Sequence, residues 1–140
     1  MSPPAEEPAQ VVAIAAEADL LRVRSALRAE AQDAGMGLTA ATKLITAGSE
    51  LARNIVRYAT HGRGHVSIER IRNGDRQGVR AVFRDDGPGI ADVDQAMRDG
   101  FSTAGSLGLG LPGSRRLVDE FSIDSQVGRG TTVMITQWRR

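Results

Sequence analysis

A glutamate and an asparagine, Glu50 and Asn54, stand four residues apart in the segment Ser49–Ala59, SELARNIVRYA. Side chains at this spacing project from the same side of a helix. An asparagine oxygen near a carboxylate suits Mg²⁺, which prefers oxygen ligands and keeps several of its waters. Taken alone, this segment favours a solvent-facing pair on an ordinary helix, so a functional interpretation depends on the other segments.

A second polar segment, RDDGPGI at Arg84–Ile90, directly follows an apolar stretch that predicts a strand. A carboxylate at a strand end can accept a hydrogen bond from an exocyclic amine. The glycines that follow, Gly87 and Gly89, allow a planar base to lie close to the backbone. An ordinary Asp-Gly, Pro-Gly turn accounts for the same residues, and the segment alone does not separate the two interpretations.

A third segment, FSTAGSLGLGLPGSRRL at Phe101–Leu117, contains four glycines between Gly105 and Gly113, just before an apolar helical pattern. Its amides, with the exposed amides at the start of a helix from Gly110, predict an anion-binding end that needs no lysine. Such a loop can also fold over a ligand and exclude water. A fourth segment, GRGTTV at Gly128–Val133, predicts by itself only a tight hairpin.

Two familiar phosphate-binding motifs do not fit these residues. Gly108, Gly110 and Gly113 have the G-x-G-x-x-G spacing, but a polar loop precedes them and Val133 stands near the position where an acidic residue is needed. The P-loop needs a glycine-lysine pair, whereas Lys43, the single lysine, follows a threonine. The sequence therefore disfavours both Rossmann and P-loop architectures.

The elements that must position these segments come in pairs of helices and pairs of strands. Because helices and strands are grouped in pairs and do not alternate along the chain, the sequence predicts an α+β fold. The expected architecture is a two-layer sandwich, in which helices cover one face of a mostly antiparallel mixed sheet. Thr39 is predicted to cap the second helix, and Asn73–Asp75 to form a hairpin turn. The predicted strands are 10–16, 65–72, 79–85, 121–126 and 131–138, and the predicted helices are 17–34, 39–59, 92–97 and 110–120.

The composition limits the function classes. Across 140 residues, 18 basic and 17 acidic side chains nearly cancel, so neither nucleic acid nor a membrane is expected as a partner. There is no cysteine, which excludes thiol catalysis and disulfides, and no long apolar run, which favours a cytoplasmic protein. Residues 1–8, MSPPAEEP, predict a disordered lead-in, and residues 9–140 a single domain.

Read in order, the four segments resemble the ATP-binding fold shared by gyrase, Hsp90, histidine kinases and MutL, the GHKL or Bergerat fold. The shared pattern is Glu-x-x-x-Asn, Asp-x-Gly-x-Gly, Gly-x-x-Gly-x-Gly-Leu and Gly-x-Gly-Thr. More closely, SELARN, DGPGI, DGFSTAGSLGLGLPGSRRLVDEFS and GRGT resemble the RsbT-type serine/threonine kinases, which act as stressosome switches in bacterial stress signalling. The resemblance covers nearly all of the chain after the first eight residues.

The resemblance implies a role for each matching residue. Asp85, rather than Asp86, takes the adenine-binding position because it stands two residues before Gly87. Asn54 matches the Mg²⁺-coordinating asparagine, and Glu50 matches the carboxylate proposed as general base. Glycines and leucines of the third segment match the lid and phosphate loop, and a threonine of the fourth lies near adenine. The implied ATP-binding residues are Asn54, Asp85, Gly87, Gly89, Gly105, Leu107, Gly108, Leu109, Gly110 and Thr131.

The function that the resemblance implies is an ATP- and Mg²⁺-dependent serine/threonine protein kinase. Its expected substrates are STAS-domain scaffold and antagonist proteins of the stressosome, and its release from the scaffold would activate a PP2C-type phosphatase. A binding module, namely an anti-sigma factor that uses nucleotide to hold a sigma factor, is the alternative. A nucleotide-dependent dimeric ATPase from a larger machine is a further alternative, which the sequence favours less.

Overall fold

The structure is a computed structural model that describes residues 10–59, 63–87, 89, 97 and 110–140. The described chain contains two long helices, one short helix and five strands. In chain order these are β1 (Gln10–Ile14), α1 (Asp19–Asp33), α2 (Leu38–Tyr58), β2 (Gly64–Asn73), β3 (Arg76–Asp85), α4 (Gly110–Leu117), β4 (Glu120–Gln126) and β5 (Gly130–Trp138).

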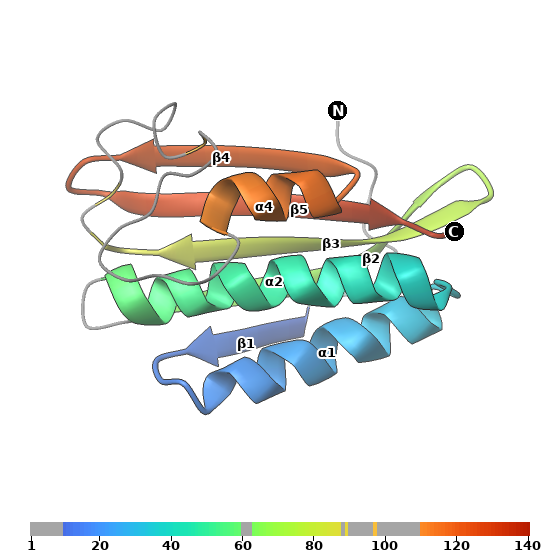
Figure 1. The fold of residues 1–140 in the computed structure, drawn as a ribbon, viewed down its shortest axis with the longest axis horizontal. Helices are drawn as coiled ribbons and strands as arrows, with labels where there is room; N and C mark the ends of the chain where they lie inside the picture. Colours follow the sequence, from blue (N-terminus) through green and yellow to red (C-terminus); the bar gives the residue numbers. More distant parts are fainter. Residues whose placement is uncertain (1–9, 60–62, 88, 90–96, 98–109) are drawn as a thin grey trace.

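The five strands form one sheet in the order β1-β2-β3-β5-β4, and every neighbouring pair in it is antiparallel. Helices α1, α2 and α4 lie side by side over one face of this sheet, with α2 in the middle (Figure 1). The predicted α+β two-layer sandwich is therefore confirmed. None of the helices in the described ranges has an apolar stretch long enough to cross a membrane.

The core lies between the helices and the sheet. On α1 the apolar residues recur at helical spacing, and Leu20, Val23, Leu27 and Ala31 are all buried. On α2, Gly48 lets the two helices approach closely, because an added Cβ there would collide with the Leu27 side chain. The same added Cβ would lie 3.5 Å from Phe83 Cζ, so α2 also packs closely against β3 at this position.

Two predicted boundaries, the end of the first strand and the start of the first helix, are wrong because Asp19 binds the backbone between them. The first strand ends at Ile14 rather than at residue 16, because the Ala15 and Ala16 N–H groups donate to the Asp19 carboxylate at 2.8 and 3.0 Å. Pairing with β2 therefore stops there, and α1 begins at Asp19 rather than at residue 17.

The start of α2 also differs from the prediction. The helix begins at Leu38 with Gly37 as its N-cap, and no side chain caps it, so the predicted Thr39 cap is wrong. The Gly37 N–H donates instead to the Arg140 carbonyl oxygen at 2.7 Å. Arg140, two residues after the end of β5, thus anchors the beginning of α2.

The predicted hairpin is confirmed, and its strands are longer than expected. Asn73 pairs with Arg76, so Gly74 and Asp75 form a two-residue turn, with Gly74 in the left-handed region at φ +64°. At its other end β3 stops at Asp85, as the DGPG sequence predicts. The predicted helix at 92–97 lies outside the described residues, apart from Met97.

Candidate functional site

A row of polar residues crosses one end of the sheet. Asp85 at the end of β3 pairs with Thr131 at the start of β5, and Thr131 pairs with Ser125 on β4. The two hydroxyl oxygens of Ser125 and Thr131 are 2.8 Å apart. Strand pairing therefore brings together two residues, Asp85 and Thr131, that the sequence places in separate candidate segments.

The Asp85 and Thr131 side chains belong to the helix-covered face of the sheet. Alternate residues of a strand share a face. Asp85 lies two residues after Phe83, and Thr131 lies two residues before Val133, and both of those apolar side chains are buried in the core. Asp86 lies beyond the last strand residue. This placement agrees with the assignment of Asp85, rather than Asp86, to a site beneath the helices.

The Asp85 carboxylate is already partly oriented by the loop that follows it. Its Oδ1 accepts a hydrogen bond from the Gly87 N–H at 2.8 Å. No other hydrogen bond to this carboxylate is present in the described parts of the chain, so Oδ2 is available to a ligand. A carboxylate held through one oxygen can present the other to a donor such as an exocyclic amine.

Two glycines let the turns at this end pack against each other without side chains. Gly130 has φ +101°, and an added Cβ would overlap the carbonyl oxygen of Asp85. Gly89 has φ +79°, and an added Cβ would lie 2.7 Å from the carbonyl carbon of Gln126. The second and fourth candidate segments therefore meet through backbone. The contact of Gly130 was not predicted, and its only sequence signal is the glycine two residues after Gly128 in GRG.

The end of α2 reaches the same polar row. Gly64 pairs with Asp85, and a Cβ added to Gly64 would lie 2.9 Å from Ile55 Cγ2 and 3.2 Å from Asp85 Cβ. The residue before Ile55 is Asn54, which is half-buried and whose side chain forms no hydrogen bond with any described residue. In Figure 1 the C-terminal end of α2 and the end of β3 lie at the same end of the molecule.

Glu50 lies one turn before Asn54 on α2 and is only 8% exposed. Its Oε1 accepts a hydrogen bond from Arg53 Nη1 at 2.5 Å, which is also an ion pair. In the described ranges no other group donates to this carboxylate. The structure thus places Glu50 and Asn54 on one helix, as predicted, and adds Arg53 between them.

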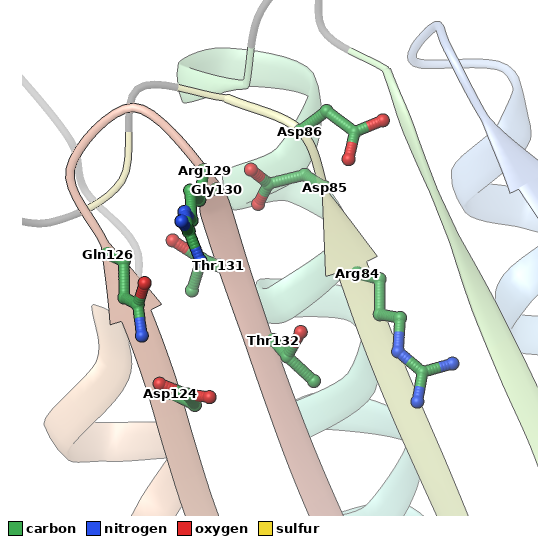
Figure 2. A pocket seen from close by; sticks show the side chains of 9 residues that line it. All are labelled: Arg84, Asp85, Asp86, Asp124, Gln126, Arg129, Gly130, Thr131 and Thr132. Carbon is green, nitrogen blue, oxygen red and sulfur yellow. The ribbon is translucent and has the colours of Figure 1, made fainter.

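A pocket of about 290 Å³ lies at the same end of the sheet (Figure 2). Figure 2 views it with α2 behind the strands, so that Arg84, Thr132 and Asp124 lie across the face opposite the helices. These three residues pair directly across β3, β5 and β4. The pocket is therefore mainly on the open face, and neither Glu50 nor Asn54 lines it. Its lining consists of Arg84, Asp85, Asp86, Asp124, Gln126, Arg129, Gly130, Thr131 and Thr132.

Most of the predicted phosphate loop lies outside the residues that the structure describes. Gly105, Leu107, Gly108 and Leu109 lie in the range 98–109, and only Gly110 is described, as the first residue of α4. Helix α4 packs beside α2 (Figure 1). Within the described residues no three acidic or histidine side chains cluster as a metal site would require.

Comparison with known proteins agrees with this architecture. Residues 39–139 match the family described as histidine kinase-, DNA gyrase B- and HSP90-like ATPase. The serine/threonine-protein kinase RsbT of Bacillus subtilis is 43% identical over 129 residues, which span 92% of this chain and 96% of the relative. An anti-sigma F factor of Geobacillus thermodenitrificans is 37% identical over 60 residues, 41% of each chain.

Solved structures show the same fold. The RsbU and RsbW domains of a Mycobacterium tuberculosis protein match with a TM-score of 0.64 and 25% identity, over 95% of this chain and 33% of that one. The mycobacterial sensor histidine kinase MprB matches with a TM-score of 0.56 and 16% identity, over 94% of this chain and 98% of that one.

The predicted resemblance and the predicted enzyme class, a serine/threonine-protein kinase, are both confirmed by these matches. The match to RsbT spans almost the full length of that protein, and the family match includes all of the described site residues from Glu50 to Thr131. This chain belongs to the histidine kinase-, DNA gyrase B- and HSP90-like ATPase family and, within it, to the group of the serine/threonine-protein kinase RsbT.

Proposed function

We propose that this chain transfers the γ-phosphoryl group of ATP to a serine or threonine hydroxyl of a partner protein. The observation that supports this most directly is the convergence of Asp85 and Thr131 with the end of α2, because it joins a base-binding carboxylate to the helix that carries Glu50 and Asn54. Membership of the ATPase family supports ATP as the phosphoryl donor.

The proposed adenine site is built on Asp85. Its free carboxylate oxygen accepts the exocyclic amine, while Gly87 holds the other oxygen. Thr131 lies opposite Asp85 on the same face, and its hydroxyl is hydrogen-bonded to Ser125. Together these groups select a purine that carries a donor at the position facing the carboxylate.

The donor set on α2 fits a magnesium ion bound together with phosphates. Asn54 offers an amide oxygen with no partner among the described residues, and Mg²⁺ commonly takes one or two protein oxygens and completes its shell with water and phosphate. The ion would supply charge neutralisation on the triphosphate. Gly105, Gly108 and Gly110, with Leu107 and Leu109, are the proposed phosphate-loop residues on sequence grounds.

Glu50 is the proposed general base. The acceptor hydroxyl gives its proton to the Glu50 carboxylate as its oxygen bonds to the γ-phosphorus, and the bond from that phosphorus to the β-phosphate oxygen breaks. ADP leaves, and the partner carries the phosphate. Because such transfer depends mainly on positioning and charge, the chain needs no covalent intermediate of its own.

The proposed partners follow from the RsbT group. We infer that the acceptors are STAS-domain scaffold and antagonist proteins, and that the chain, once released from them, binds and activates a PP2C-type phosphatase. The match to a structure that contains RsbU and RsbW domains supports a regulatory setting of this kind. The kinase would then act as a switch in bacterial stress signalling.

A second candidate function is sequestration of a sigma factor. It is favoured by the identity of 37% to an anti-sigma F factor, which extends over 60 residues only. The two functions differ in outcome, since a kinase leaves phosphate on its partner whereas an anti-sigma factor holds a sigma factor in an ATP-dependent complex without needing transfer to it.

The deciding experiment incubates the purified chain with γ-labelled ATP, Mg²⁺ and candidate STAS-domain proteins, and maps the modified residue by mass spectrometry. Phosphate on a partner serine or threonine supports the kinase. ATP-dependent capture of a sigma factor with no labelled protein would support the second candidate and contradict the first.

The adenine assignment has its own test. Asp85→Asn is expected to weaken ATP binding about 10- to 100-fold in calorimetry, because a charged acceptor is lost. Asp86→Asn is the matched control, since Asp86 lies beyond the strand end and is expected to bind ATP as the wild type does. Unchanged ATP affinity in Asp85→Asn would remove Asp85 from the site.

A further inference from the structure

Among the described residues, the ion pair with Arg53 is the one polar contact of the Glu50 carboxylate. A buried carboxylate normally satisfies several donors, because leaving its oxygens without partners is costly. Glu50 is 8% exposed, yet one side chain alone donates to it among the described residues, and its Oε2 accepts from none of them. Among the described residues Oε2 is not one of the fully buried side-chain atoms that lack a partner, so this oxygen keeps an accessible surface. An accessible oxygen with no donor from the described residues, at a proposed phosphoryl-transfer site, is suited to receive a substrate proton.

A second acid-arginine pair in this chain differs from the Glu50–Arg53 pair in its contacts. Asp19 and Arg22 have the same spacing of three residues on α1, with a separation of 2.8 Å. The Asp19 carboxylate, however, also accepts two backbone N–H groups, from Ala15 and Ala16, and joins β1 to α1. That pair therefore has a structural role, whereas among the described residues the hydrogen bond of the Glu50–Arg53 pair links only positions one turn apart on α2.

The geometry points to Arg53 as the positioning residue for Glu50. Arg53 Nη1 contacts Oε1 at 2.5 Å, and the two side chains are 32% and 10% exposed. A charge-assisted hydrogen bond in such a sheltered place restricts the glutamate to one rotamer. Arg53 thus holds one oxygen so that the other meets the acceptor hydroxyl. This inference rests on the proposed kinase function.

A different role for the same guanidinium would be a contact to the ATP phosphates, since arginine binds phosphate readily. The two roles predict different kinetics. A positioning residue changes kcat and leaves ATP affinity alone, whereas a phosphate contact changes both. Because Arg53 is bound to Glu50 rather than free, the structure favours positioning.

The test compares Arg53→Met and Arg53→Lys in the full chain, using the STAS acceptor that the wild type phosphorylates. We expect Arg53→Met to lower kcat about 10-fold, since small misplacement of a catalytic group is costly, with the ATP dissociation constant within about twofold of the wild type. Arg53→Lys keeps the charge and is expected to recover kcat to within about threefold of the wild type. Arg22→Met, which breaks the other pair, is expected to leave kcat unchanged.

A double variant shows whether Arg53 acts through Glu50. In a Glu50→Gln background, Arg53→Met is expected to cause no further loss of kcat, because residues that work as a unit are not additive. Wild-type kcat in Arg53→Met, an equal loss of ATP affinity, additive losses in the double variant, or no recovery with lysine would each overturn the inference. If the wild type transfers no phosphate at all, the proposed function itself fails and the inference fails with it.

Discussion

Gly130 lies against the backbone of Asp85 so closely that a Cβ added to it would overlap the Asp85 carbonyl oxygen and sit 2.9 Å from the carbonyl carbon. The contact joins the start of β5 to the end of β3, which is the point where the adenine-binding carboxylate is proposed to stand. The glycine therefore determines how far the β4–β5 turn can approach the loop after Asp85.

Gly130→Ala is expected to destabilise the protein and weaken ATP binding. The φ of +101° is unfavourable for alanine, and relief of the overlap requires the backbone of β3 to move, so we expect a loss of about 3 kcal/mol in the free energy of unfolding. Displacement of Asp85 should also reduce ATP affinity about tenfold. Denaturant unfolding and calorimetry measure the two effects.

Gly128 provides the matched control for this prediction. It also has positive φ, +82°, but an added Cβ there would have no atom within 4 Å. Gly128→Ala is expected to cost about 1–2 kcal/mol from the backbone conformation alone and to bind ATP normally. Equal effects of the two substitutions on ATP binding would show that the contact with Asp85 is unimportant.

Local patterns predicted most of the elements because each depends on neighbours in sequence. The buried stripe of α1, including Val23 and Leu27, follows from helical periodicity, and the turn at Gly74 follows from the Asn-Gly pair. The start of α2 was predicted wrongly because Gly37 is held by Arg140, from the far end of the chain. No local pattern contains such a contact.

In the site, too, features that depend on neighbours in sequence were predictable, and features that depend on distant contacts were not. The sequence predicts that Glu50 and Asn54 lie on the same side of one helix, because this requires only the helical repeat. The pairing of Asp85 with Thr131 depends on the strand order, in which β5 lies between β3 and β4, and the sequence pattern does not specify that order. From the sequence, only the family resemblance predicts that these two residues share one site.

The contacts of the Asp19 carboxyl group predict that the free energy of unfolding depends on pH. The N–H groups of Ala15 and Ala16, with the nearby Arg22, hold the pKa of the Asp19 carboxyl below its ordinary value of 3.8. Because the pKa is lower in the folded state, the ionised carboxylate stabilises the fold at pH values above the pKa of the unfolded state. This contribution disappears as the pH falls through the lower pKa of the folded state. The difference in unfolding free energy between wild type and Asp19→Asn should therefore be constant near neutral pH and shrink below about pH 3.8.

The control for Asp19 is Asp33→Asn, at the opposite end of α1. Asp33 is exposed, and its carboxylate accepts no hydrogen bond from the part of the chain that the structure describes. This substitution is expected to change stability by less than about 0.5 kcal/mol at every pH. Urea unfolding from pH 7 to pH 3 measures both variants, and a gap for Asp19→Asn that does not narrow below pH 3.8 would contradict the assignment.

Asn54→Ala is expected to remove most of the phosphoryl transfer by weakening the metal site. Loss of the amide oxygen should lower kcat at least about 100-fold, equivalent to about 2.7 kcal/mol in the barrier, and should raise the Mg²⁺ concentration needed for half-maximal activity. Asn73, the only other asparagine, lies in the β2–β3 hairpin, and Asn73→Ala is expected to keep wild-type activity. A magnesium titration of kinase activity distinguishes them, and an Asn54→Ala variant with the wild-type rate and the wild-type magnesium requirement would show that the ion is held elsewhere.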